Sequence, residues 1–155
     1  MNAAATLAAE VSLIVVRDAA GIRLELPATL AAIDAADAQV TRYLTEAGVP
    51  VDRFAVRILL REALLNAVIH GSGQDPQKAV RLALTLEPDA VVLTVEDQGP
   101  GFAWEERDTT FDIVGDGGRG LALMQTYASS VTFNQRGNCV VLRRRWDQPA
   151  ATPQN

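Results

Sequence analysis

Apolar and polar positions divide the chain into segments with two different periods. Strict alternation, or a short β-branched run, is typical of a strand and occurs in six segments. They are residues 11–16, 22–26, 79–86, 91–95, 131–133 and 138–142. Turn residues separate them in pairs, at 18–21, 87–89 and 136–137. The pattern therefore predicts three hairpins.

Three other segments repeat apolar residues every three or four positions, as an amphipathic helix does. The expected N-caps and stops are Thr29 and Gly48 for a helix that ends near residue 47, and Asp52 and Gly71 for a helix over 54–69. Residues 121–127 predict a short third helix. The element order is ββααββ, a long loop, then αββ. That order favours an α+β two-layer sandwich, with helices on one face of a mainly antiparallel sheet.

Length and composition limit the classes of function that the chain could have. The chain has 155 residues, a size typical of one domain, and we expect that domain over 1–147 with a disordered tail at 148–155. A net charge of −5 argues against nucleic acid as a partner. One cysteine and one histidine exclude an internal disulfide and the common zinc sites. The sequence has neither a signal-peptide pattern nor an apolar run long enough to span a bilayer, so a cytoplasmic protein with no membrane partner is expected.

Glu62, Asn66 and His70 share one stripe of the second predicted helix, because they are spaced four residues apart. The helix is otherwise rich in apolar residues, and burying an unpaired carboxylate or carboxamide is costly. The stripe is therefore either the solvated face of the helix or a binding surface.

Two further clusters hold glycines. Asp97 follows a predicted strand and precedes Gly99 and Gly101, so it is either an acidic turn or an acceptor for an exocyclic amine beside a flat ring. Residues 115–120 read GDGGRG and open the third helix, where backbone N–H groups favour an anion. This string also matches the dinucleotide fingerprint, but no acidic residue lies about 20 positions further on.

Together, the three clusters resemble the motifs of the GHKL superfamily of histidine-kinase-like ATPases. The string EALLNAVIHG at 62–71 resembles the N-box, DQGPGF at 97–102 the first glycine box, and GRGLALM at 118–124 the second. Spacing and size are most similar to the anti-sigma-factor serine/threonine kinases, over residues 22–145. The resemblance implies a Bergerat-type ATP-binding fold with a mixed, mainly antiparallel sheet.

The resemblance also implies roles for the individual residues. Asp97 would bind the adenine amine, Asn66 would bind Mg²⁺, and Glu62 would be the catalytic base or orienting carboxylate. The remaining residues of the ATP site would be His70, Gly99, Gly101, Gly118, Arg119, Gly120 and Leu121. Residues 102–117 would form the ATP lid. Arg119 would reach the γ-phosphate or lie on the surface.

The implied substrate is a serine or threonine of a small STAS-type anti-sigma-factor antagonist. A sigma factor and a second copy of the chain are the other implied partners. The lid departs from the family pattern because it holds five acidic residues, at 105, 106, 108, 112 and 116. We therefore keep three functions open: a protein kinase, an ATP-dependent binding switch without phosphotransfer, and a detached histidine-kinase ATPase module.

Overall fold

The computed structural model describes residues 11–100 and 116–146, and within this part the side chains of residues 116–119 are left out. Its elements, in chain order, are β1 (Ile14–Asp18), β2 (Gly21–Pro27), α2 (Leu30–Ala47), α3 (Arg53–Leu65), the π-helix η1 (Asn66–Gly71), β3 (Ala79–Leu86), β4 (Ala90–Glu96), α4 (Asp116–Tyr127), β5 (Ser130–Phe133) and β6 (Cys139–Arg145). This order confirms the predicted sequence of strands and helices.

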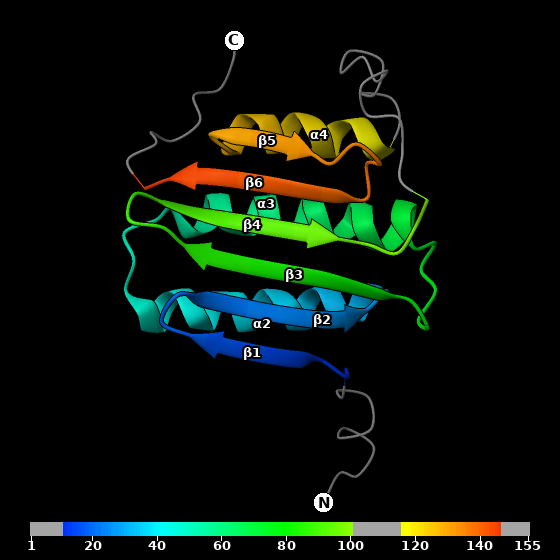
Figure 1. Cartoon of the computed structure of the whole chain (residues 1–155), viewed down its shortest axis with the longest axis horizontal. Coiled ribbons are helices and arrows are strands. Elements are labelled where there is room, and N and C mark those ends of the chain that lie inside the picture. Colours follow the sequence, from blue (N-terminus) through cyan, green and yellow to red (C-terminus); the bar gives the residue numbers. More distant parts are fainter. Residues whose placement is uncertain (1–10, 101–115, 147–155) are drawn as a thin grey trace, which may run out of the picture.

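The strands form one sheet in the order β1-β2-β3-β4-β6-β5. Each of its five pairings is antiparallel, so the described part of the sheet contains no parallel pair. Helices α2, α3 and α4 lie side by side on one face of the sheet (Figure 1). The predicted α+β two-layer sandwich is thereby confirmed. None of the described helices is long and apolar enough to cross a membrane.

The core lies between the helices and the inward face of the sheet. Leu24, Leu82, Val95 and Val140 pair in register across four neighbouring strands, and all four are buried. Strand alternation places them on one face, so each apolar pattern in the sequence contributes to the same layer. Burying side chains of this size contributes about 1.5 to 3 kcal/mol each, before the entropy cost of ordering them.

Local capping interactions start and end the helices where the sequence predicts. The Thr29 hydroxyl accepts from Ala32 N at 3.2 Å, and an Asp52 carboxylate oxygen accepts from Ala55 N at 3.2 Å. Gly48 ends α2 in the left-handed conformation at φ +66°, which favours glycine.

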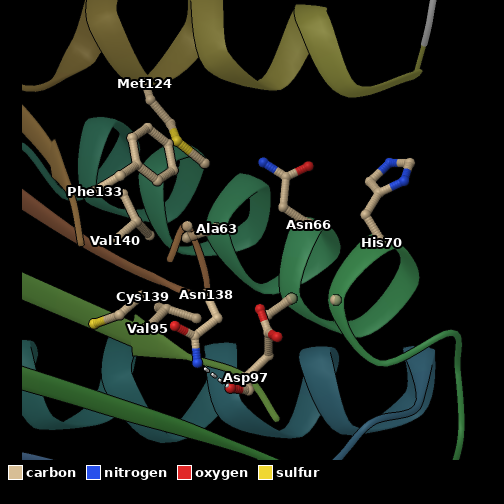
Figure 2. A pocket seen from close by; sticks show the side chains of 13 residues that line it. Ala63, Asn66, His70, Val95, Asp97, Met124, Phe133, Asn138, Cys139 and Val140 are labelled. Carbon is tan, nitrogen blue, oxygen red and sulfur yellow. Dashed lines mark hydrogen bonds between the residues drawn. The ribbon is translucent and has the colours of Figure 1, made fainter. Parts of the chain in front are cut away.

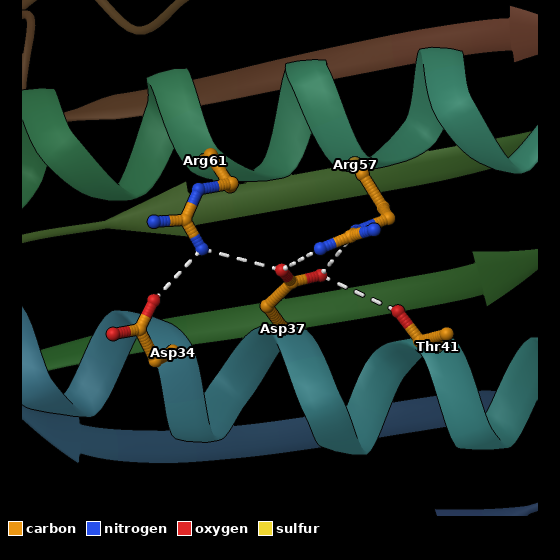
Figure 3. Close-up of polar contacts among 5 residues, drawn as sticks. All are labelled: Asp34, Asp37, Thr41, Arg57 and Arg61. Atoms are coloured by element: carbon orange, nitrogen blue, oxygen red, sulfur yellow. Dashed lines mark hydrogen bonds and ion pairs between the residues drawn. The ribbon is translucent and has the colours of Figure 1, made fainter.

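A buried carboxylate fastens α2 to α3. Asp37, only 5% exposed, accepts from Arg57 Nε at 3.2 Å and from Nη2 at 2.9 Å (Figure 3). Arg61 Nη1 bridges Asp37 at 3.2 Å and Asp34 at 3.0 Å. Because the hydrogen bonds of Asp37 are charge-assisted, its burial is compensated. The two helices are therefore held in a fixed relative position.

Several boundaries differ from the predicted ones. The helix expected over 54–69 is divided, because α3 passes into η1 at Asn66. Helix α4 begins at Asp116 rather than at residue 121, although glycines at 117, 118 and 120 have low helix propensity. Strand β1 begins at Ile14 and reaches Asp18, whose carboxylate also accepts from Ala20 N and Gly21 N in the turn. The tail predicted at 148–155 lies outside the described residues, so this part of the domain assignment stays a prediction.

Candidate functional site

A pocket lies where four parts of the fold meet: the end of α3 with η1, the end of β4, helix α4, and the β5–β6 hairpin (Figure 2). Its lining includes three of the residues predicted from sequence, Asn66, His70 and Asp97. These three come from two elements that are far apart in the sequence. The fold therefore brings the first two polar clusters to one pocket.

The start of α4 lies directly against the stripe of polar residues on α3 and η1. A Cβ added to Gly120 would lie 3.0 Å from Glu62 Oε2 and 3.4 Å from Asn66 Nδ2. Glu62 and Asn66 are half-buried, whereas His70 is exposed. Figure 2 shows Asn66 and His70 extending toward α4. The stripe is thus not simply a solvated face, because another helix covers part of it.

The π-helical turn η1 carries Asn66 and His70, and it ends where the chain at Gly71 lies against Asp97. The turn is wider than an α-helix, and Ser72 N donates to Ala67 O at 2.9 Å, five residues back. It ends at Gly71, where an added Cβ would collide with the Asp97 carboxylate. Glycine is therefore required at position 71 by the close fit of Asp97.

Asp97 lies one residue beyond β4, as predicted, with its carboxylate enclosed by glycines. Asp97 Oδ1 accepts from Gly99 N at 2.7 Å. An added Cβ at Gly99 would collide with the Gly71 carbonyl, so glycine is needed here for chain packing. The approach of Gly99 to a flat ring stays a prediction. Partial burial raises the pKa of Asp97 above its usual 3.8, while the Gly99 bond and, more weakly, Arg136 and Lys78 act in the opposite direction.

The wall opposite the polar residues is apolar. Val95, Met124, Phe133 and Val140 line it, and in Figure 2 they gather on the side of the pocket away from His70. A pocket with apolar walls and one carboxylate at its end suits a flat heterocycle that carries an amine. Sequence reasoning missed these residues, since in the chain they read only as core positions of α4, β4, β5 and β6.

The third cluster is partly described. The glycines at 118 and 120 lie in the first turns of α4 rather than in a loop, and Leu121 is buried. The N-terminus of α4 carries partial positive charge from its unpaired N–H groups, which favours an anion. Gly101 and most of the predicted lid at 102–117 lie outside the described residues, and the Arg119 side chain is likewise not described.

The donor set fits a nucleotide-bound cation better than a metal centre of its own. The described residues contain no group of three or more histidine, cysteine, aspartate or glutamate side chains that could hold a metal. Asn66 and Glu62 offer a carboxamide and a carboxylate at the start of α4. Mg²⁺ typically takes one or two protein oxygens and completes its shell with phosphate and water oxygens. Asn66 therefore fits as a ligand of Mg²⁺ carried by a polyphosphate, with the Glu62 carboxylate beside it.

Comparisons with known proteins relate this chain to regulators of sigma factors by the names of its relatives. A protein named anti-sigma F factor from Geobacillus sp. (strain WCH70) is 29% identical over 97 residues, which cover 57% of this chain and 66% of that protein. The protein of the same name from Geobacillus stearothermophilus is 29% identical over 99 residues, which cover 59% and 68%. That from Bacillus velezensis is 30% identical over 84 residues, which cover 51% and 58%. The chain spans about two thirds of the length of the first two relatives.

The family comparison covers more of the chain. The family described as the histidine kinase-like ATPase domain matches residues 26–144, which include all three motif clusters and the whole pocket. This description implies an ATP-binding site. The chain belongs to the histidine kinase-like ATPase family.

Proposed function

We propose that the protein is an ATP-dependent serine/threonine kinase of the anti-sigma-factor type. One observation supports this best: Glu62 and Asn66 lie side by side at the start of α4, next to the pocket that ends at Asp97. A base, a cation ligand and an anion-binding helix start are then adjacent. Phosphoryl transfer needs chiefly this kind of positioning and charge neutralisation.

Each residue has a role in this proposal. Asp97 accepts a hydrogen bond from the adenine amine, and the apolar wall holds the ring. Asn66 binds Mg²⁺, which when present neutralises charge on the phosphates. Gly118, Gly120 and Leu121 hold the phosphates at the start of α4, whereas the roles of Gly101 and of the Arg119 side chain rest on the resemblance alone. His70 reaches the phosphate end of the site. Glu62 orients or deprotonates the hydroxyl that attacks the γ-phosphate.

The proposed substrate is a serine or threonine of a STAS-type anti-sigma-factor antagonist. The names of the relatives support a sigma-factor circuit, since several are called anti-sigma F factor. In this proposal the chain also binds a sigma factor and acts as a homodimer. Such partners belong to the transcription machinery, so the reaction would take place in the cytoplasm.

A second candidate is an ATP-dependent binding switch that transfers no phosphate. The observation that favours it is the acidic character of the predicted lid, which holds five acidic residues, at 105, 106, 108, 112 and 116. Like charges near a triphosphate repel it, although salt screens the exposed ones. A detached histidine-kinase ATPase module is the third reading, and it would lack a protein hydroxyl as substrate.

The test compares phosphate incorporation into a candidate antagonist by the parent protein and by Glu62→Gln. We expect transfer to fall by about 10²- to 10⁴-fold, the usual contribution of a positioned base, with ATP affinity nearly unchanged. Glu46→Gln, an exposed carboxylate at the end of α2, is the matched control and should transfer at the parental rate. A parent protein that binds ATP and antagonist but transfers nothing would support the switch instead.

A further inference from the structure

Asn138, in the β5–β6 turn, contacts Asp97 through hydrogen bonds that the motifs do not explain. Asp97 N donates to Asn138 O at 2.9 Å, and Asn138 Nδ2 donates to Asp97 O at 3.0 Å. The main chain of Asp97 is thus held on both sides, at the point where β4 has ended. Asn138 also lines the pocket itself.

Asn134 fixes the orientation of the Asn138 carboxamide. Asn134 Nδ2 donates to Asn138 Oδ1 at 2.7 Å, which leaves Nδ2 of Asn138 directed to Asp97 O. Asn134 Oδ1 accepts from the main-chain N–H groups of Gly137 at 2.7 Å, Asn138 at 3.0 Å and Cys139 at 3.2 Å. Its side chain therefore both shapes the turn and orients Asn138.

The Asp97 carboxylate has little room to move. Its carboxylate fits between Gly71 and Gly99, where neither residue leaves room for a Cβ, and Oδ1 is bonded to Gly99 N. An exocyclic amine would bond one of the two carboxylate oxygens, whose positions depend on the Asp97 main chain as well as on its side chain. Hydrogen bonds prefer donor angles above about 150°, so a rotation of this main chain that bends the bond to the amine would weaken recognition.

We propose that Asn134 and Asn138 are positioning residues that determine the preference of the site for a base with an exocyclic amine. Asn138 holds the Asp97 main chain, and Asn134 holds Asn138. This inference rests on the proposed ATP site and adds a determinant of selectivity outside the three motifs. It predicts that the turn affects recognition of the amine more than it affects binding of the phosphates.

The experiment measures affinities for ATP and for purine riboside triphosphate, which lacks the exocyclic amine, by calorimetry on the full chain with Mg²⁺. The variants are Asn138→Ala and Asn134→Asp. Asn134→Asp keeps the acceptor for three main-chain N–H groups but loses the donor to Asn138, so it leaves the turn capped. Gln135→Ala, exposed in the same turn, is the matched control.

We expect the parent to prefer ATP, and both variants to reduce that preference about tenfold, mainly by losing affinity for ATP. The control should keep the parental ratio. Equal losses for both nucleotides would show a merely structural role and overturn the inference, as would parental ratios in both variants. A parent that binds neither nucleotide would overturn the proposed ATP site together with the inference.

Discussion

The ionised Asp97 carboxylate lowers the stability of the nucleotide-free protein. Its carboxylate is partly removed from water, and this desolvation raises its pKa above the usual 3.8. The folded protein therefore binds the Asp97 proton more tightly than the unfolded chain does. Such a group contributes stability below its unfolded pKa, and the contribution is lost as pH rises through the folded-state pKa. Near neutral pH the ionised carboxylate is retained at the expense of stability.

Asp97→Asn should accordingly raise the free energy of unfolding of the nucleotide-free protein at neutral pH. The substituted carboxamide keeps an acceptor for Gly99 N but carries no charge to desolvate. The gain should shrink as pH falls toward 3.8, where the parental carboxyl also becomes neutral. Urea unfolding of both proteins at neutral and acidic pH measures this. Asp34→Asn, at an exposed carboxylate, should give no such gain. A variant less stable than the parent at neutral pH would contradict the account.

At the scale of elements, Arg144 connects the C-terminus of α4 to the N-terminus of α3. This side chain is only 1% exposed, and Nη1 donates to Tyr127 O at the end of α4 at 2.6 Å. Nη2 lies 3.7 Å from Oδ2 of Asp52, the N-cap of α3. A cation at the C-terminus of α4 complements the helix dipole. Arg144 therefore sets where α4 lies against α3, and hence where its N-terminus meets Glu62 and Asn66.

Arg144→Ala should lower the free energy of unfolding by about 2 to 4 kcal/mol, from lost charge-assisted hydrogen bonds and a cavity. Arg144→Met fills most of the volume and should lose less, because an apolar side chain leaves no buried charge. Both variants should bind ATP more weakly than the parent, since the start of α4 is displaced. Denaturant unfolding and calorimetry measure the two effects. Parental stability in Arg144→Ala would show that the contact contributes nothing.

The sequence predicts those elements whose causes are local. Thr29 and Asp52 mark helix starts because each side chain accepts a hydrogen bond from the main-chain N–H three residues further on. Such an N-cap depends only on neighbouring residues, so it can be read from the sequence. The π-turn could not be predicted, because its residues have the apolar spacing of an ordinary helix and the contact at its end joins Gly71 to Asp97, 26 positions away in the chain. The sequence predicts a start of α4 at residue 121 rather than at Asp116, because glycines disfavour a helix and the contacts of α4 with α3 are not visible in a local pattern.

The same distinction holds for the site. Glu62, Asn66 and His70 share a stripe by helical spacing alone, and Asp97 follows a strand whose end is visible in the alternation. The pairing of Asn138 with Asp97 depends on the neighbouring positions of β4 and β6 in the sheet. No local pattern contains that information. The polar residues of the site were thus predictable, whereas the residues that position them were not.

At the scale of the whole molecule, the site lies at one end of the sandwich, where the helix layer and the sheet layer both contribute. Glu62 and Asn66 come from the helix layer, whereas Asp97 and Asn138 come from the sheet layer, directly after the end of β4 and directly before the start of β6. A nucleotide bound there would contact both layers. It would also offset the cost of the ionised Asp97, because its amine would replace the lost water.

The most direct test of this account is calorimetric titration of the full chain with ATP and with GTP in the presence of Mg²⁺. Adenine presents an amine where guanine presents a carbonyl, and the Asp97 carboxylate accepts only from the amine. The account predicts tighter binding of ATP than of GTP, and a loss of about 2 kcal/mol in ATP binding for Asp97→Asn. Equal affinity for the two nucleotides, or an Asp97→Asn protein that binds ATP as the parent does, would contradict it.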